Sequence, residues 1–206
     1  MRTIPVFLFC IVLSLASGCA SFVTPTPYLA YHRLPSDQVS NQGLVKLYWA
    51  DKTVSLSPYK NIVVKRFVAS KTVGTTPLVN PKVYSSKLYK LMLSDLKKKG
   101  KKAAVSPKEF SKDMPYLILE GSIAQINPGN KRLRAWLPGQ AGRAIFEVEV
   151  KVSRVDRGTR VLCAEFTSTQ TKASGRWGGK DADLLNICMR RVSKHISAFM
   201  ATHRNQ

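Results

Sequence analysis

The sequence predicts an α+β fold, an antiparallel or mixed sheet of about four to five strands with two main helices packed on one face. Three observations predict it. Residues 145–155 alternate apolar and polar side chains, as half-buried antiparallel strands do. The segments that follow Pro81 and Asp181 instead repeat apolar residues every three or four positions, as amphipathic helices do. The order strand, helix, several strands, helix suits a sheet covered on one side.

The first half of the domain predicts a strand, a helix and a second strand. Residues 61–68 (NIVVKRFV) are rich in β-branched and aromatic side chains. Asn80 and Pro81 are a preferred cap and first residue of a helix, which we expect to end at Gly100. Residues 103–106 predict a short strand. Residues 44–49 (LVKLYW) fit either a short strand or an apolar clamp on the domain.

The second half predicts three antiparallel strands, over 116–126, 145–155 and 161–171, with a turn at Arg157 and Gly158. Pairing Lys151 with Glu165 places apolar residues opposite apolar residues on the other face: Val150 opposite Phe166 and Val152 opposite Ala164. We expect the charged pair on the solvent side. The same register places Cys163 opposite Ser153, on the outer face.

The last helix should bury one apolar stripe. Its members recur at spacings of three and four residues: Leu185, Cys188, Val192, Ile196 and Phe199. Cys188 is therefore expected in the core and Cys163 outside it. We expect both to be small apolar residues rather than a disulfide, although an oxidising compartment would favour pairing them.

The chain begins like a secreted protein. Residues 1–18 hold one charge, Arg2, and an apolar run from Val6 to Ala16, which together are typical of a signal peptide. Residues 16–19 (ASGC) resemble the bacterial lipobox, which implies cleavage between Gly18 and Cys19 and attachment of acyl chains such as palmitate to Cys19. Ala20, rather than Asp, at the next position implies delivery to the outer membrane.

These segments divide the chain into a signal peptide (1–18), a lipidated tether (19–59) and a single domain (60–206). The location expected is the outer membrane, lipid-anchored and facing the periplasm. The alternatives are an ordinary cleaved signal with a chance cysteine and an uncleaved anchor.

The chain is strongly basic, with 33 Lys and Arg against 12 Asp and Glu and a net charge of +21. In the envelope such a charge either attracts anionic lipid or cell-wall material or forms a solvated surface. Two segments are candidate contact sites for a protein or anion. They contain Arg132, Arg134 and Trp136, and Lys97, Lys98, Lys99, Lys101 and Lys102.

No residue pattern predicts catalysis, a metal site or a cofactor. The three histidines are scattered, and no nucleophile lies beside a base in the sequence. The loop from Gly139 to Gly142 resembles an anion cradle, but a strand follows it, so we interpret it as a structural turn.

Several segments resemble the bacterial lipoproteins grouped as domain of unknown function 4410. They are residues 119–121 (LEG), 127–130 (NPGN), 139–143 (GQAGR), 146–150 (FEVEV), 161–166 (VLCAEF) and the closing helix. The resemblance covers roughly residues 61–199. Where such proteins usually carry a Gly-x-Gly-x-Gly-like turn, residues 138–142 here are PGQAG. The family has no established activity, so the resemblance implies a class of protein and no catalytic residue.

The sequence therefore predicts a non-enzymatic cell-envelope protein. It would be held at a membrane by an N-terminal lipid and would bind or scaffold another envelope component, either a protein or anionic cell-wall or lipid material. An envelope enzyme with a site assembled from scattered residues is the alternative. A basic nucleic-acid-binding protein is a further alternative only if the signal interpretation is wrong; otherwise no nucleic acid is expected.

Overall fold

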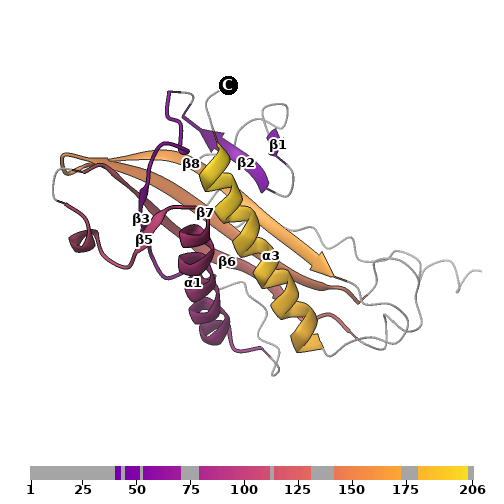
Figure 1. Cartoon of the computed structure of the whole chain (residues 1–206). Helices are drawn as coiled ribbons and strands as arrows, with labels where there is room; N and C mark the ends of the chain where they lie inside the picture. Colours follow the sequence, from indigo (N-terminus) through magenta and orange to yellow (C-terminus); the bar gives the residue numbers. More distant parts are fainter. Residues whose placement is uncertain are drawn as a thin grey trace, which may run out of the picture.

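Two helices lie side by side on one face of a mixed sheet in the computed structural model of the chain (Figure 1). The structure describes residues 40–42, 45–51, 53–70, 79–111, 114–130, 142–172 and 181–203. Its elements are β1 (Ser40–Gln42), β2 (Val45–Ala50), β3 (Asn61–Val64), β4 (Val68–Ala69), α1 (Pro81–Lys98), β5 (Lys102–Ala104), the 3₁₀ helix η4 (Pro107–Glu109), β6 (Tyr116–Asn127), β7 (Ala144–Asp156), β8 (Thr159–Lys172) and α3 (Asp181–Thr202). The α+β prediction is confirmed.

The predicted number of four to five strands was wrong, because the described part of the chain already forms a sheet of eight. Their order is β1-β2-β8-β7-β6-β3-β5, and β4 pairs with β6. Strands β1 and β2 come from the segment predicted as a tether, so the sheet begins before residue 60. Strand β2 runs antiparallel to β8, which settles the open choice for residues 44–49 in favour of a strand. The short strand predicted over residues 103–106 is present as β5, whereas pieces as short as β1 and β4 have too few residues for a recognisable alternation.

Helix α1 lies in the connection between the parallel strands β3 and β5, and it packs on the sheet. It begins where predicted, since the Asn80 side chain accepts a hydrogen bond from the N–H of Lys82 at 3.1 Å and Pro81 is the first residue. It ends before Gly100, whose φ of +75° is a conformation that glycine adopts without strain.

Strands β6, β7 and β8 form a long antiparallel meander. Arg157 and Gly158 join β7 to β8 with φ values of 48° and 81°, the combination of a two-residue type I′ turn. The pairs Lys151–Glu165, Val150–Phe166 and Val152–Ala164 are all present, so the predicted register is confirmed.

Two details of that register differ from the prediction. Glu165 is not on a wet face, because β2 continues the sheet beyond β8 and Trp49 pairs with Glu165, whose exposure is 0%. Cys163 does not lie opposite Ser153 on the outer face. A bulge after Val152 pairs Ser153 with Leu162, and Cys163 is buried with 2% exposure.

The main core lies between the helices and the sheet. The predicted stripe of α3 is confirmed, because all five of its residues are buried there. Cys163 and Cys188 are both free and both belong to this core, as expected of small apolar side chains. Within the described ranges, no helix has the length and apolar composition needed to cross a membrane.

Candidate binding groove

A short irregular segment, residues 51 and 53–60, forms one wall of an open groove. It is held in place at both ends, because the N–H of Asp51 donates to the carbonyl of Cys163 at 2.9 Å and the carbonyl of Lys60 accepts from the N–H of Lys102 at 2.7 Å. The side chain and the N–H of Thr53 donate to Asp51 Oδ1 at 2.7 and 2.8 Å, and these hydrogen bonds lower the pKa of Asp51. Val54 and Leu56 are buried in the main core. The segment therefore presents its remaining side chains from a fixed backbone.

Lys101 holds the middle of this wall from behind. Its ammonium donates to the carbonyls of Ser57 and Tyr59 at 2.7 and 2.8 Å, and the residue is buried. Burial lowers the pKa of Lys101. The carbonyl of His203, directly after α3, accepts from the N–H of Ser57 at 3.0 Å. Two distant parts of the chain thus fix the same short segment.

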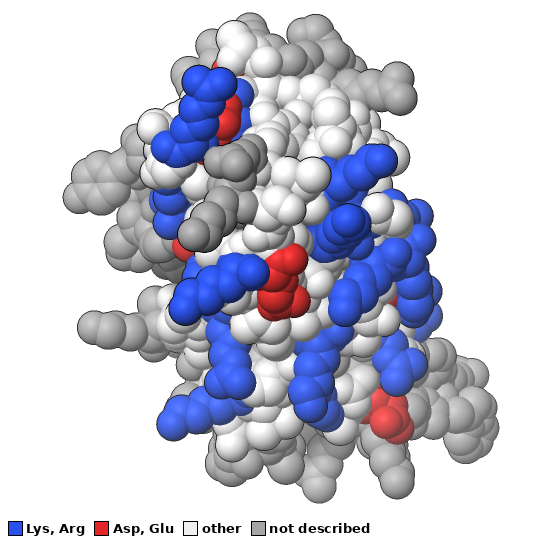
Figure 2. Space-filling view, turned by 60° about the vertical axis from the view of Figure 1, so that its left-hand side comes forward, with Lys and Arg blue, Asp and Glu red and all other residues white. Residues whose placement is uncertain are grey.

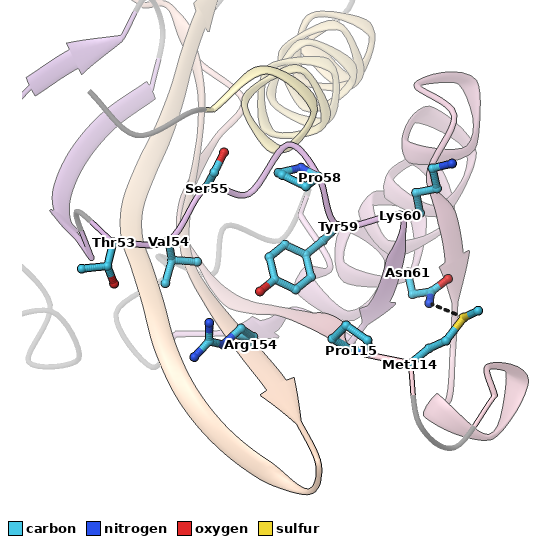
Figure 3. A pocket seen from close by; sticks show the side chains of 10 residues that line it. All are labelled: Thr53, Val54, Ser55, Pro58, Tyr59, Lys60, Asn61, Met114, Pro115 and Arg154. Carbon is cyan, nitrogen blue, oxygen red and sulfur yellow. Dashed lines mark hydrogen bonds between the residues drawn. The ribbon is translucent and has the colours of Figure 1, made fainter.

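The groove has a volume of about 560 Å³, within the range of small-ligand sites. Its walls come from the segment just described, from the start of β3, from the two residues before β6, and from β7. Figure 3 shows the Tyr59 hydroxyl pointing toward the guanidinium of Arg154 across the groove. A hydrogen bond between these side chains raises the pKa of Arg154. The lining residues are Thr53, Val54, Ser55, Pro58, Tyr59, Lys60, Asn61, Met114, Pro115 and Arg154.

Met114 forms the far rim and separates this groove from a second hollow. Its sulfur accepts a hydrogen bond from Asn61 Nδ2 at 3.6 Å, and its exposure is 53%. The second hollow, of about 460 Å³, is lined by Pro107, Lys108, Phe110, Ser111, Met114, Tyr116, Val155, Arg157 and Gly158. Below it Phe110 and Tyr116 pack on a small cluster of buried apolar residues that is separate from the main core.

The chemistry of the groove suits an anionic ligand with an apolar body. Arg154 offers a planar set of donors that matches a carboxylate or phosphate, and the Tyr59 hydroxyl points toward it. The rings of Tyr59 and Pro58 and the side chain of Met114 supply apolar contact. Among the described residues, no group of three or more His, Cys, Asp or Glu side chains could hold a metal ion.

Comparison with known proteins identifies the family. The domain of unknown function DUF4410 matches residues 62–176, more than half of the 206 residues. The chain belongs to this family. The resemblance predicted from the sequence is confirmed. Strand β3 from its second residue, α1, the meander and Arg154 lie inside the matched range, whereas Tyr59 lies just before it and α3 after it.

Solved structures of similar fold share little sequence with this DUF4410 protein. The PelC dodecamer from Paraburkholderia phytofirmans is 12% identical, covers 74% of this chain and 97% of its own, and has a TM-score of 0.43. A minor lipoprotein from Acinetobacter baumannii is 14% identical, covers 69% of this chain and 91% of its own, and has a TM-score of 0.39. No protein with a curated description matches the chain.

The site residues predicted from the sequence fall into two groups. Gly18, Cys19, Arg132, Arg134 and Trp136 lie outside the described residues. The basic run, Lys97–Lys99 with Lys101 and Lys102, lies within them, and its side chains do not all point the same way. The side chains of Lys97, Lys98, Lys99 and Lys102 are exposed, whereas Lys101 points inward to the groove wall. The run therefore presents four ammonium groups to solvent.

Sequence reasoning missed the groove itself. Tyr59 was the last residue of the predicted tether, and Arg154 was an ordinary position of an alternating strand. The two are 95 positions apart and meet only because the segment before β3 folds back across the end of the sheet. The one local signal was the run Pro58, Tyr59, Lys60, which joins a rigid residue to an aromatic and a cationic one.

Proposed function

We propose that this DUF4410 protein is a lipid-anchored protein of the bacterial cell envelope that binds an anionic envelope component in the groove beside Arg154. It is held at the outer membrane, faces the periplasm and catalyses no reaction. The single observation that carries the proposal is the Arg154 guanidinium, which lines an open groove of ligand size with the Tyr59 hydroxyl pointing toward it.

The proposed anchoring rests on residues 1–20. Acyl chains on Cys19 would give stable attachment, since two chains suffice for stable membrane binding. Confinement at one membrane raises the effective concentration of the groove near any partner in the same compartment. An anchored protein can therefore act with modest affinity.

The proposed binding role rests on the kind of side chains in the groove. Arginine stays protonated at any physiological pH, so Arg154 is suited to recognise negative charge rather than to transfer protons. The second hollow places Lys108 and Arg157 beyond Met114, so a ligand that extends across this rim meets further positive charge. The basic segment with Arg132, Arg134 and Trp136 remains part of the proposal as an additional contact. Charge reversal of Arg132 and Arg134 should weaken recovery of the partner.

Photo-crosslinking in the native host tests the groove. A benzoylphenylalanine at Met114 should yield a discrete crosslinked product, and Arg154→Ala in the same protein should remove it. The matched substitution is Arg66→Ala, an exposed arginine that does not line the groove. The matched probe position is Val68, which is 68% exposed on β4. Equal products from Met114 and Val68, or a Met114 product unaffected by Arg154→Ala, would overturn the groove as the binding site.

Labelled fatty-acid incorporation tests the anchor separately. Wild type should take up the label and fractionate with the outer membrane, and Cys19→Ala should do neither. An unlabelled wild type found in the cytosol would contradict the envelope location, and the positive charge would then point to nucleic acid.

A further inference from the structure

The outward side of the two helices carries a concentration of positive charge that the groove does not use. We name it the cationic helical face and define it by seven exposed residues: Lys87, Lys90, Lys97 and Lys98 of α1, and Arg190, Arg191 and Lys194 of α3. We propose that this face docks on the anionic phospholipid headgroups of the membrane. The proposal goes beyond ligand binding in the groove, because it assigns the domain an orientation relative to the membrane surface.

The geometry of the helical layer turns these side chains the same way. Residues Lys87, Lys90, Ser94 and Lys97 of α1 recur at helical spacing and are all exposed, while Leu88, Met92 and Leu96 between them are buried against the sheet. Arg190, Arg191 and Lys194 of α3 alternate in the same way with buried Met189, Val192 and Ile196.

The two stripes lie next to each other because the helices are tied together. Ser193 of α3 donates to Asp95 Oδ2 of α1 at 2.7 Å in a buried hydrogen bond. Both helices lie in front of the sheet in Figure 1. Figure 2, whose rotation carries the helical layer toward the right, shows Lys and Arg gathered there with only small areas of Asp and Glu. The seven cations therefore belong to one surface.

Few carboxylates neutralise this surface. Among the described side chains of α1 and α3, the exposed carboxylate is Asp183, in the first turn of α3. Asp95 is buried between the helices, with Ser193 as its partner and Lys98 at 3.6 Å. Positive charge in such excess attracts an anionic surface, and each Lys or Arg near anionic headgroups adds to the attraction.

Apolar side chains among the cations favour a membrane over a soluble polyanion. Val83 of α1 is 44% exposed and Ile187 of α3 is 37% exposed, and both lie on the same outward stripes as the lysines and arginines. Basic residues with interspersed apolar ones are typical of helices that lie at a lipid interface. A dissolved polyanion would recognise the charges but would gain nothing from these two residues.

Docking through this face leaves the groove open. None of the residues that line either hollow belongs to α1 or α3. The two hollows lie around Met114, Arg154 and the turn between β7 and β8. A domain resting on its helices therefore keeps Arg154 accessible to a partner.

Site-specific fluorescence in vesicles tests the orientation. The full chain, with its lipid, is reconstituted into vesicles of neutral phosphatidylcholine or of phosphatidylcholine with phosphatidylglycerol, each with a small fraction of headgroup-nitroxide lipid. A thiol-reactive fluorophore is placed by Val83→Cys or, at the groove rim, by Met114→Cys. The native Cys163 and Cys188 are buried and should not compete for the label. In the anionic vesicles we expect quenching at position 83 and little at position 114.

Charge reversal provides the decisive control. Arg190→Glu, Arg191→Glu and Lys194→Glu together should abolish the quenching at position 83, as should high salt, because the attraction is screened. The matched triple variant reverses Lys60, Lys108 and Arg157, which lie outside α1 and α3, and should retain it. Since each variant loses three positive charges and gains three negative ones, net charge cannot explain a difference.

Three results would overturn the proposal. One is equal quenching at positions 83 and 114, and another is quenching that is the same in neutral and anionic vesicles. The third is an unquenched position 83 in a protein whose binding to soluble polyphosphate depends on Arg190, Arg191 and Lys194. In that case the cationic helical face binds a dissolved polyanion. None of these results depends on the crosslinking at Met114, so the two proposals fail separately.

Discussion

The two faces of the sheet bury their side chains by different means. On the helix-covered face, Phe146, Val148, Val150 and Val152 of β7 are fully buried in an apolar core. On the opposite face the intervening positions are charged or polar. Glu149, one of these positions, is buried too, and it accepts a hydrogen bond from Ser122 Oγ at 3.0 Å.

The difference shows that a buried position in this protein need not be apolar. The helix-covered face gains stability from removing apolar surface from water. On the opposite face a buried charge is paired with an opposite one, since Lys151 Nζ lies 2.5 Å from Glu165 Oε1. The change in the free energy of unfolding should therefore depend on the side-chain volume removed on the helix-covered face. On the opposite face it should depend on whether a buried charge keeps its partner.

The largest effect is expected from Phe146→Ala on the helix-covered face. The ring is fully buried beside Tyr84, with ring centres 6.2 Å apart, so its loss leaves a cavity that the sheet and α1 cannot close. The free energy of unfolding should fall by about 3–5 kcal/mol, measured by denaturant titration. A loss below about 1 kcal/mol would mean that this core repacks freely.

Removing one partner of the buried ion pair on the opposite face should lower the free energy of unfolding nearly as much, whereas removing both should not. Lys151→Met leaves the Glu165 carboxylate buried without its cation and should lower stability by about 3 kcal/mol. The double variant Lys151→Met, Glu165→Leu should recover most of that loss, since neither charge remains. If the double variant is no more stable than the single one, pairing does not govern this face.

An exposed pair on the same face supplies a smaller effect. Arg160 and Glu120 form an ion pair whose side chains are 46% and 29% exposed. Arg160→Met should change the free energy of unfolding by less than about 1 kcal/mol, because water solvates the remaining carboxylate. The same denaturant titration measures it, and a loss equal to that of Lys151→Met would show that exposure makes no difference here.

The smallest effect concerns a buried polar group with no partner. His203 stacks on Phe199 with ring centres 4.7 Å apart, its Nδ1 has no hydrogen-bond partner among the described residues, and burial lowers its pKa from 6.5. The unfolded chain therefore takes up a proton first as the pH falls below 6.5, and stability is lost in that window. Thermal unfolding between about pH 7.5 and 5 should show a shallower fall for His203→Asn than for wild type.

The sequence predicted the apolar face well because its signals are local. Alternation over β7, the caps of α1 and the turn at Arg157 and Gly158 each depend on a few neighbouring residues. Even the pairing of β7 with β8 followed from matching Lys151 to Glu165. These features are encoded where they occur, so one sequence is enough to find them.

The polar face and the groove depend on residues far apart in the chain. The burial of Glu165 requires β2, and the burial of Cys163 requires a bulge that no residue type announces. Lys101 looked like one more lysine of a basic run, yet its ammonium meets carbonyls some forty positions earlier. The groove, which lies on described residues, was accordingly not predicted. The basic segments and the lipobox were predicted as sites and stay predictions.

The contact between Ser57 and His203 has a consequence for the order in which the protein matures. The wall of the groove precedes β3, but the carbonyl that fixes it follows the last turn of α3. A chain that is synthesised from its N-terminus cannot form this hydrogen bond until α3 has also been made. The wall of the groove is therefore completed late, after the sheet and α1 are available to fold.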